Sequence, residues 1–243
     1  MKFLARGIWL GGLLAVASAA QAEVTSTVTL VSDYDYRGFS QSGTDPAVQL
    51  SIDYAASSGF YAGVWASTID DFLDYDGNGV AETEVDVYAG FAGSFTDDLG
   101  WDAGINYYTY PGASDLNYFE IYGKLSYKAL TGAIYWSDDF AGLDNADLPP
   151  GVASGSALYF SLDAAIPAGP LSLGLHAGFS TGDGIEGLLG GVEDSYEDYS
   201  IGLSYAANNF ATELKWVLMD AHQAGSDDRV LLSVSTTLPW SND

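Results

Sequence analysis

The sequence has no cysteine and few basic residues. Its 243 residues hold 7 Lys and Arg against 33 Asp and Glu. An exported chain without disulfides must be held together by a large core or by a closed, hydrogen-bonded sheet in lipid. The acidic excess repels nucleic-acid phosphates and anionic lipid surfaces, so we set both aside as direct partners.

Long apolar runs are absent after residue 22. The first residues place Lys2 and Arg6 before a short apolar stretch that ends in Ala20, Gln21 and Ala22. This pattern is typical of a secretory signal peptide, and we expect cleavage after Ala22. The chain then divides into a signal peptide (1–22) and one mature domain (23–243). An uncleaved membrane anchor is the alternative, although the run is short for a spanning helix.

Glycine, aromatic residues and a strict two-residue alternation dominate the rest of the chain. Gly occurs 29 times, Tyr 17 times and Trp 6 times. Period-two alternation of apolar and polar residues indicates strands whose two faces differ. Each alternating segment has about the length of a tilted transmembrane strand, and their number is even. The twelve predicted strands are 24–34, 46–55, 59–68, 83–95, 100–110, 117–127, 131–137, 155–166, 171–180, 197–206, 210–219 and 228–240.

The connections between these segments alternate in length. Links after even-numbered segments are short, such as "AASSG" and "PAGP", and links after odd-numbered ones are long and acidic, such as "DDFLDYDGNGVAETE". Outer-membrane barrels have this rhythm of periplasmic turns and extracellular loops, with both termini in the periplasm. A soluble β-sandwich shares the alternating strands but does not predict the rhythm. The sequence therefore predicts an all-β protein, an antiparallel up-and-down transmembrane barrel of twelve strands.

Aromatic residues near the strand ends support the membrane interpretation. Tyr, Phe and Trp on the apolar face form girdles at the two membrane interfaces of such barrels. The residues predicted to form the girdles are Tyr34, Tyr54, Phe60, Trp101, Phe119, Tyr127, Trp136, Phe210 and Trp240.

The polar face of the strands predicts a lumen rich in carboxylates, with His176 among its residues. Carboxylates in a narrow aqueous passage attract cations and exclude anions, so a conducting barrel would favour cations. In the alternative, large side chains such as Tyr88, Tyr108, Tyr122 and Tyr159 fill the lumen as a polar plug; twelve strands are compatible with both. The residues predicted to line a pore are Asp33, Asp35, Arg37, Asp53, Glu84, Asp86, Asp102, Glu120, Lys124, Asp163, Glu213, Lys215 and Arg229.

The two arginines of this set bracket the point where the barrel must close. An unpaired strand edge is costly in hydrocarbon, so the first and last strands must pair. Pairing brings Asp33, Asp35 and Arg37 to the same outer rim as Arg229. We predict a small charge ladder at this seam, in which the scarce arginines neutralise rim carboxylates. The alternative places Arg37 in a solvated loop.

Three stretches of the first third resemble a known family. "SDYDYRGFSQSGTDPAVQLSIDY" (32–54), "GFYAGVWAS" (59–67) and "TEVDVYAG" (83–90) resemble the signature of the TorF-type porins, also described as the Gcw_chp family of proteobacterial outer-membrane proteins. The resemblance implies an outer-membrane barrel with pore activity assigned by analogy, and it supplies no catalytic residues. The chain differs in its acidic third-strand loop and in its ending "LPWSND", which leaves Trp240 as the residue for the assembly machinery to recognise.

Two further motifs are incomplete. "DYDGNGVAETEV" (74–85) resembles part of a calcium loop but has Val85 where a bidentate Glu belongs, so we expect at most weak Ca²⁺ or Mg²⁺ binding; a hydrated turn is the alternative. "GFSTG" (178–182) matches the G-x-S-x-G nucleophile pattern, but that pattern needs a strand-to-helix elbow, and we expect an acidic loop there. We predict no enzyme. The candidate metal ligands are Asp74, Asp76, Asn78 and Glu82.

The predicted function is that of a porin-like outer-membrane protein through which small solutes diffuse passively, with a preference for cations. The alternative is a non-conducting barrel with a structural or surface-binding role. Its acidic loops could bind divalent cations that bridge them to lipopolysaccharide phosphates. The expected partners are outer-membrane lipid, lipopolysaccharide, small ions or solutes and the outer-membrane assembly machinery.

Overall fold

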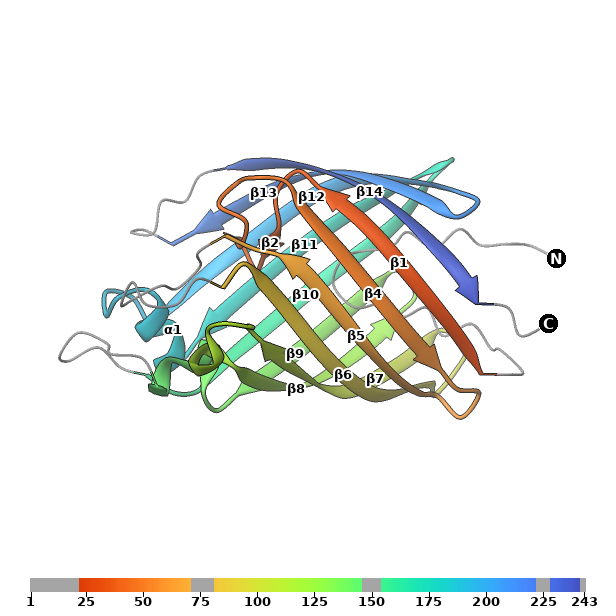
Figure 1. The fold of residues 1–243 in the computed structure, drawn as a ribbon. Helices are drawn as coiled ribbons and strands as arrows, with labels where there is room; N and C mark the ends of the chain where they lie inside the picture. Colours follow the sequence, from red (N-terminus) through yellow and green to blue (C-terminus); the bar gives the residue numbers. More distant parts are fainter. Residues whose placement is uncertain (1–21, 71–80, 146–153, 222–227, 241–243) are drawn as a thin grey trace.

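The chain folds into one closed barrel of antiparallel strands (Figure 1). A computed structural model describes residues 22–70, 81–145, 154–221 and 228–240. The strands run around the barrel in the order β1, β14, β13, β12, β11, β10, β9, β8, β7, β6, β5 and β4. Their bounds are β1 Glu23–Val31, β4 Ala47–Ala55, β5 Phe60–Thr68, β6 Thr83–Ser94, β7 Leu99–Thr109, β8 Tyr118–Tyr127, β9 Leu130–Ser137, β10 Ala157–Ala168, β11 Leu171–Thr181, β12 Ser195–Ala207, β13 Phe210–Asp220 and β14 Arg229–Trp240. The fold confirms the predicted class and all twelve strands.

Closure depends on β1, which pairs on both sides. Val28 lies opposite Thr236 of β14 and opposite Leu50 of β4. The ring of twelve therefore leaves no edge unpaired, as hydrocarbon requires. Among the described residues, no helix is long and apolar enough to span a membrane.

The outer surface of the barrel is apolar. On β4, Val48, Leu50 and Ile52 are 44%, 51% and 57% exposed, whereas the intervening Gln49 is 3% exposed. A water-soluble barrel would show the opposite distribution, because exposed contiguous apolar surface is unfavourable in water. The strands therefore direct their apolar faces toward lipid and their polar faces into the lumen.

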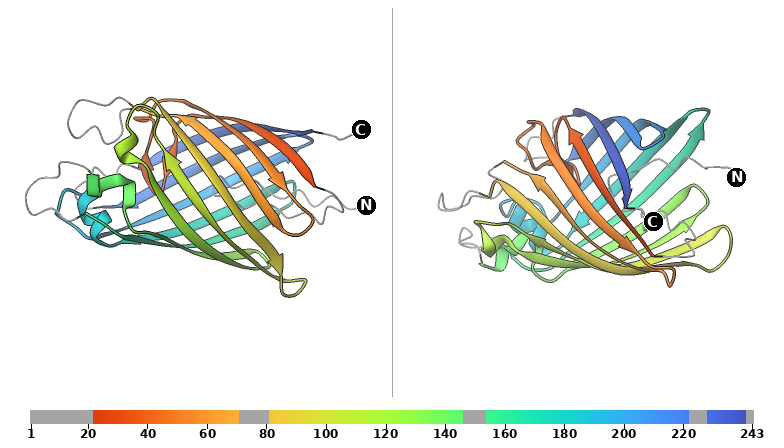
Figure 2. Two further views of the ribbon diagram at one scale, coloured as in Figure 1. Left: turned by 60° about the horizontal axis from the view of Figure 1, so that its bottom comes forward. Right: turned by 45° about the vertical axis from the view of Figure 1, so that its right-hand side comes forward.

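The two ends of the barrel differ (Figures 1 and 2). At the end where β1 begins and β14 ends, β8 and β9, β10 and β11, and β12 and β13 are joined by two-residue turns. Lys128 and Asn208 take φ values of 55° in these turns, as primed hairpin turns require. Short turns mark the periplasmic end of outer-membrane barrels. The opposite end, called the outer end here, carries η1 (Ser114–Leu116), η2 (Phe140–Asn145) and α1 (Asp183–Leu188).

A hairpin inside the outer end is the main departure from the predicted strands. The first strand ends at Val31 and not at residue 34, because the chain leaves the sheet there and turns into the lumen. Residues 32–46, called the inward hairpin, include the two short strands β2 (Asp35–Tyr36) and β3 (Phe39–Ser40), which pair only with each other.

Most of the buried apolar side chains in the described part of the chain gather around this hairpin in one cluster. Parts of the inward hairpin, η2 and α1 contribute to it, together with the outer ends of several strands. The members of this outer cluster are Val31, Tyr34, Ala47, Ile69, Ala81, Tyr108, Tyr110, Tyr118, Phe140, Ala141, Leu143, Ala157, Ile185, Tyr196, Met219 and Ala221.

The aromatic girdles are confirmed at seven of the nine predicted residues. Tyr54, Phe119, Tyr127, Trp136 and Phe210 are exposed on the lipid face. Phe60 packs against the rings of Tyr54 and Phe91, and Trp101 packs against Phe95, on the same face. The prediction for Tyr34 is wrong: its ring is buried and lies edge-on to Trp65 at 5.3 Å in the outer cluster, because the chain has already turned inward. The side chain of Trp240 lies outside the described residues.

A charge on the lipid face tests the membrane orientation. Leu162 is 57% exposed in the middle of β10, so Leu162→Arg should lower the free energy of unfolding by about 2–4 kcal/mol in phospholipid vesicles. Leu171→Arg, at the periplasmic start of β11, is the matched control and should cost about 0–1 kcal/mol. Denaturant titration followed by tryptophan fluorescence measures both. Equal and negligible effects would mean that this surface faces water.

Candidate functional site

The lumen contains a cavity of about 650 Å³. It reaches from residues near the periplasmic turns, among them Thr25, Ala129 and Thr237, to the inward hairpin at Tyr34, Asp35 and Arg37. Beyond the hairpin lies the outer cluster of buried side chains. The cavity is thus a vestibule on the periplasmic side, lined by both polar and apolar side chains.

The base of the inward hairpin is held at the seam by two cations of the last strands. Arg229 of β14 donates hydrogen bonds to Asp33, to Asp35 (2.5 Å) and to the carbonyl of Gly38. Lys215 of β13 donates to Asp35 at 3.2 Å. These contacts bring Arg229 together with Asp33 and Asp35, as the predicted charge ladder requires.

Arg37 lies elsewhere, and both interpretations made for it from the sequence are wrong. Its guanidinium donates to Glu120 of β8 at 2.8 Å, and the two side chains are 8% and 2% exposed. The guanidinium also lies over the rings of Tyr36, Tyr135 and Tyr159 at 4.8, 5.0 and 4.2 Å. The inward hairpin carries Arg37 across the lumen to the opposite wall, away from the seam and from solvent. We call Tyr36, Tyr135, Tyr159 and Glu120 the Arg37 cage.

Tyrosine hydroxyls complete the surroundings of the cage. Tyr108 donates to Glu120 at 2.8 Å, and Tyr36 donates to Tyr108 at 3.3 Å. Burial raises the pKa of Tyr36 well above its ordinary value, so its hydroxyl stays protonated at neutral pH. Glu120 therefore accepts from both a cation and a phenol, which compensates for its removal from water.

Tyrosine and carboxylate side chains also pair across the cavity below the hairpin. Tyr88 donates to Asp53, and Tyr61 donates to Asp102 at 2.5 Å. The ammonium group of Lys124 lies 4.7 Å from the centre of the Tyr122 ring. The tyrosines of the plug alternative thus do occupy the lumen, and they leave the cavity open between them.

His176 of β11 joins two carboxylates on the neighbouring strands. Its Nδ1 lies 2.6 Å from Asp163 and its Nε2 lies 2.8 Å from Asp198. Tyr159 of the Arg37 cage lies 3.0 Å from the same Nε2. The cage and the His176 group therefore form one continuous network.

Nine of the thirteen predicted pore-lining residues line the cavity: Asp33, Asp35, Arg37, Asp53, Asp86, Lys124, Asp163, Glu213 and Lys215. The other four do not, because nearby side chains cover them. The inward hairpin covers Glu120 and Arg229. Glu120 binds Arg37 of the hairpin, and Arg229 binds Asp33. Tyr61 binds Asp102, and Tyr34 of the outer cluster lies beside Glu84, which is 2% exposed.

Three lumen residues were missed by the sequence reasoning. Asp198 lies on the inward face of β12 (Ser195–Ala207), and the alternation of Tyr196, Asp198 and Ser200 is the signal that could have revealed it. Tyr61 and Tyr135 alternate inward on β5 and β9 but were not singled out.

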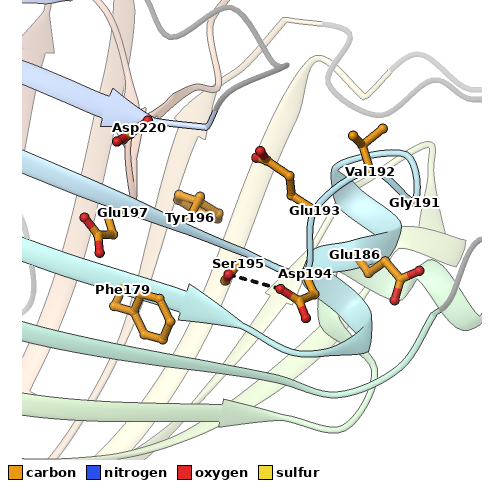
Figure 3. A pocket seen from close by; sticks show the side chains of 10 residues that line it. All are labelled: Phe179, Glu186, Gly191, Val192, Glu193, Asp194, Ser195, Tyr196, Glu197 and Asp220. Carbon is orange, nitrogen blue, oxygen red and sulfur yellow. Dashed lines mark hydrogen bonds between the residues drawn. The ribbon is translucent and has the colours of Figure 1, made fainter.

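The candidate metal ligands stay largely untested. Asp74, Asp76 and Asn78 lie outside the described residues, and Glu82 is exposed just before β6. Within the residues that the structure describes, no group of three His, Cys, Asp or Glu side chains could hold a metal ion. An acidic cleft at the outer end is lined by Glu186, Glu193, Asp194, Glu197 and Asp220 together with Phe179 and Tyr196 (Figure 3).

The G-x-S-x-G stretch does not form a nucleophile elbow. A short helix, α1, follows β11 where a loop was expected, but Ser180 lies within the strand and is fully buried. His176 is engaged by Asp163 and Asp198.

Comparison with known proteins gives one family and a set of porin folds. A family model described as "Bacterial protein of unknown function (Gcw_chp)" matches residues 15–237. No curated protein sequence matches the chain at a significant level.

Among solved structures, the KdgM porin aligns with a TM-score of 0.53 at 11% identity over 88% of this chain and 98% of its own. The KdgM porin in complex with disordered oligogalacturonate aligns equally well. The NanC porin aligns with a TM-score of 0.50 at 11% identity over 88% of this chain and 97% of its own. At this identity the likeness establishes the fold: a closed antiparallel barrel like those of these porins.

The buried pair of the Arg37 cage allows a stability test. Arg37→Met leaves Glu120 buried without its cation and should destabilise the barrel by about 3–5 kcal/mol. Adding Glu120→Gln should recover part of this loss, as a coupling energy of about 0.5–3 kcal/mol. Denaturant unfolding of the refolded proteins measures the cycle. Lys128→Met is the control, since its pair with Asp98 is 3.8 Å long and both side chains are 59% exposed; it should change little. If the effects of the two substitutions on the free energy of unfolding were additive, they would contradict the pairing of Arg37 with Glu120.

Proposed function

Because this chain belongs to the Gcw_chp family and folds as a porin-like outer-membrane barrel, we propose that small solutes diffuse through it passively and that it favours cations. The observation that supports this most directly is the charge on the cavity wall. Asp33, Asp35, Asp53, Asp86, Asp163, Asp198 and Glu213 line the cavity, against Arg37, Lys124 and Lys215. An excess of carboxylates in a narrow passage raises the local concentration of cations.

Passage also requires the inward hairpin to move, since the hairpin and the outer cluster fill the outer end. β2 and β3 pair only with each other, so the hairpin can leave the lumen without breaking any pairing of the barrel strands. Its polar anchors are ion pairs with Arg229, Lys215 and Glu120. We therefore propose that the barrel is closed at rest and opens by release of the hairpin.

The class of solute proposed for this chain differs from the ligand of one structurally similar porin. A KdgM porin was solved with oligogalacturonate, a chain of sugar acids. The carboxylates of this lumen would repel such anions, which favours cationic or neutral small solutes here.

A non-conducting structural barrel is the second candidate, and the outer cluster favours it, because sixteen buried residues at one end make a stable closure. In that role we propose that acidic loops, including Asp74, Asp76, Asn78 and Glu82, bind Ca²⁺ or Mg²⁺ weakly and meet lipopolysaccharide phosphates through these ions. For both candidates we propose a mature chain that starts at Glu23 after signal-peptide cleavage, insertion by the outer-membrane assembly machinery, and no enzymatic activity.

Planar-bilayer recording separates the candidates. A variant in which residues 35–40 are replaced by a Gly-Ser linker should show step conductances far more often than the wild-type barrel, with a reversal potential in a KCl gradient that favours K⁺. Lys128→Gln, at an exposed periplasmic turn, should leave the opening frequency at the wild-type level. A silent hairpin variant, after heat-modifiable migration has confirmed its folding, would support the non-conducting barrel; a Cl⁻ preference would contradict the proposed selectivity.

A further inference from the structure

We propose that the Arg37 cage is a binding site for small organic cations, of the guanidinium or quaternary ammonium type, and that Arg37 is its built-in occupant. This inference rests on the proposed function in one respect: such a cation would be the solute that opens the barrel. The chain would then hold an internal copy of its own ligand.

The composition of the cage fits this ligand class. Three ring faces surround the guanidinium of Arg37: Tyr159 at 4.2 Å and Tyr135 at 5.0 Å on the barrel wall, and Tyr36 of the hairpin itself at 4.8 Å. The two wall rings stay in place when the hairpin leaves. Rings of this kind attract organic cations through the negative charge of their faces, and aromatic cages recognise quaternary ammonium groups in this way. Glu120 supplies the opposite charge at 2.8 Å.

The burial of the cage selects against small inorganic ions. With Arg37 in the cage, the side chain of Glu120 is 2% exposed, so a cation that takes the place of Arg37 must give up most of its hydration. A guanidinium is weakly hydrated and loses little in this exchange, whereas a compact, strongly hydrated cation loses more. The cage therefore favours organic cations over K⁺.

A solute can reach the cage from the periplasmic side. Tyr36, Tyr135, Tyr159 and Arg37 itself line the cavity, which extends to the periplasmic turns. Asp53, Asp163 and Asp198 line the same cavity and attract cations toward the cage.

The present occupant sits in the two-residue turn between β2 and β3. Arg37 has a φ of 50° and the next residue, Gly38, a φ of 89°, so both take the left-handed region that primed hairpin turns require. This region is less favourable for a side chain other than glycine. An external cation can occupy the cage without adopting this turn, so it can compete with Arg37. Since a ligand shifts an equilibrium toward the state that it binds better, its binding releases the hairpin.

Removal of Arg37 should expose the site to added cations. In the refolded full barrel in detergent, methylguanidinium and tetramethylammonium should bind Arg37→Ala at least about tenfold more tightly than wild type, because the internal competitor is gone. Calorimetric titration measures the binding. Neither K⁺ nor the neutral analogue urea should bind, and Arg37→Ala with Glu120→Gln should lose the binding of both organic cations.

Lys128→Ala is the matched control. It also removes one cation, but Lys128 lies in an exposed periplasmic turn, where it pairs with Asp98 at 3.8 Å, away from the inward hairpin. Tetramethylammonium should therefore bind Lys128→Ala no more tightly than wild type. Equal binding to both alanine variants, or no binding to a folded Arg37→Ala barrel, would overturn the proposal.

A second measurement tests the wild-type cage itself. The chain has no cysteine, so Gln41→Cys introduces a single thiol in the inward hairpin at a position that is 3% exposed. Millimolar methylguanidinium should accelerate maleimide labelling of this thiol several-fold, and KCl at equal ionic strength should not. An unchanged labelling rate would overturn the competition between solute and Arg37.

Both measurements are made in detergent and need no current. A silent bilayer together with cation binding would contradict only the proposed conduction and would leave the site established. A cation-selective current without organic-cation binding would contradict only the site.

Discussion

The structure depends on one constraint, the pairing of every strand edge within a hydrocarbon solvent. β1 must find both β4 and β14, because lipid offers no water to the backbone groups of a free edge. Closure fixes what the two faces of each strand contact. The apolar face meets lipid, and the polar face is enclosed in a lumen with limited space for water. The inverted distribution of exposed apolar and buried polar side chains follows from this.

Enclosure in the lumen explains why its charged groups are so extensively paired. A carboxylate removed from water must be compensated by a cation or a hydrogen-bond donor. The chain has few cations, and some serve more than one carboxylate: Arg229 binds two, and His176 lies between two. Tyrosine hydroxyls serve the carboxylates that no cation reaches, such as Asp53 beside Tyr88.

Ion pairs and aromatic contacts of the same kind also hold the inward hairpin in the lumen. It is covalently part of the barrel but outside the barrel's ladder of strand pairs. Its position depends on ion pairs at its base, on Arg37 at its tip and on aromatic contacts such as that of Phe39 with Tyr196, whose ring centres lie 5.1 Å apart. Backbone hydrogen bonds also hold it, such as that from the N–H of Asp70 to the carbonyl of Gln41 at 2.9 Å. A segment outside the strand ladder can still be displaced while the barrel stays intact, and the proposed opening of the outer end rests on this.

The sequence by itself determined the barrel. The period-two pattern specifies where the strands lie and which face of each meets lipid. The alternation of short and long connections specifies the two ends of the barrel. Each is a local consequence of strands that cross lipid. Seam pairing of Arg229 with Asp33 and Asp35 also followed, since closure makes the first and last strands neighbours. Only the tertiary structure decided where the chain after Val31 goes. The alternation in "SDYDYRG" continues past the end of β1, so no local pattern shows that Tyr34 turns inward or that Arg37 meets Glu120 and the rings of Tyr135 and Tyr159. Those contacts join residues more than eighty positions apart, and the free energy of packing inside the finished barrel selects them.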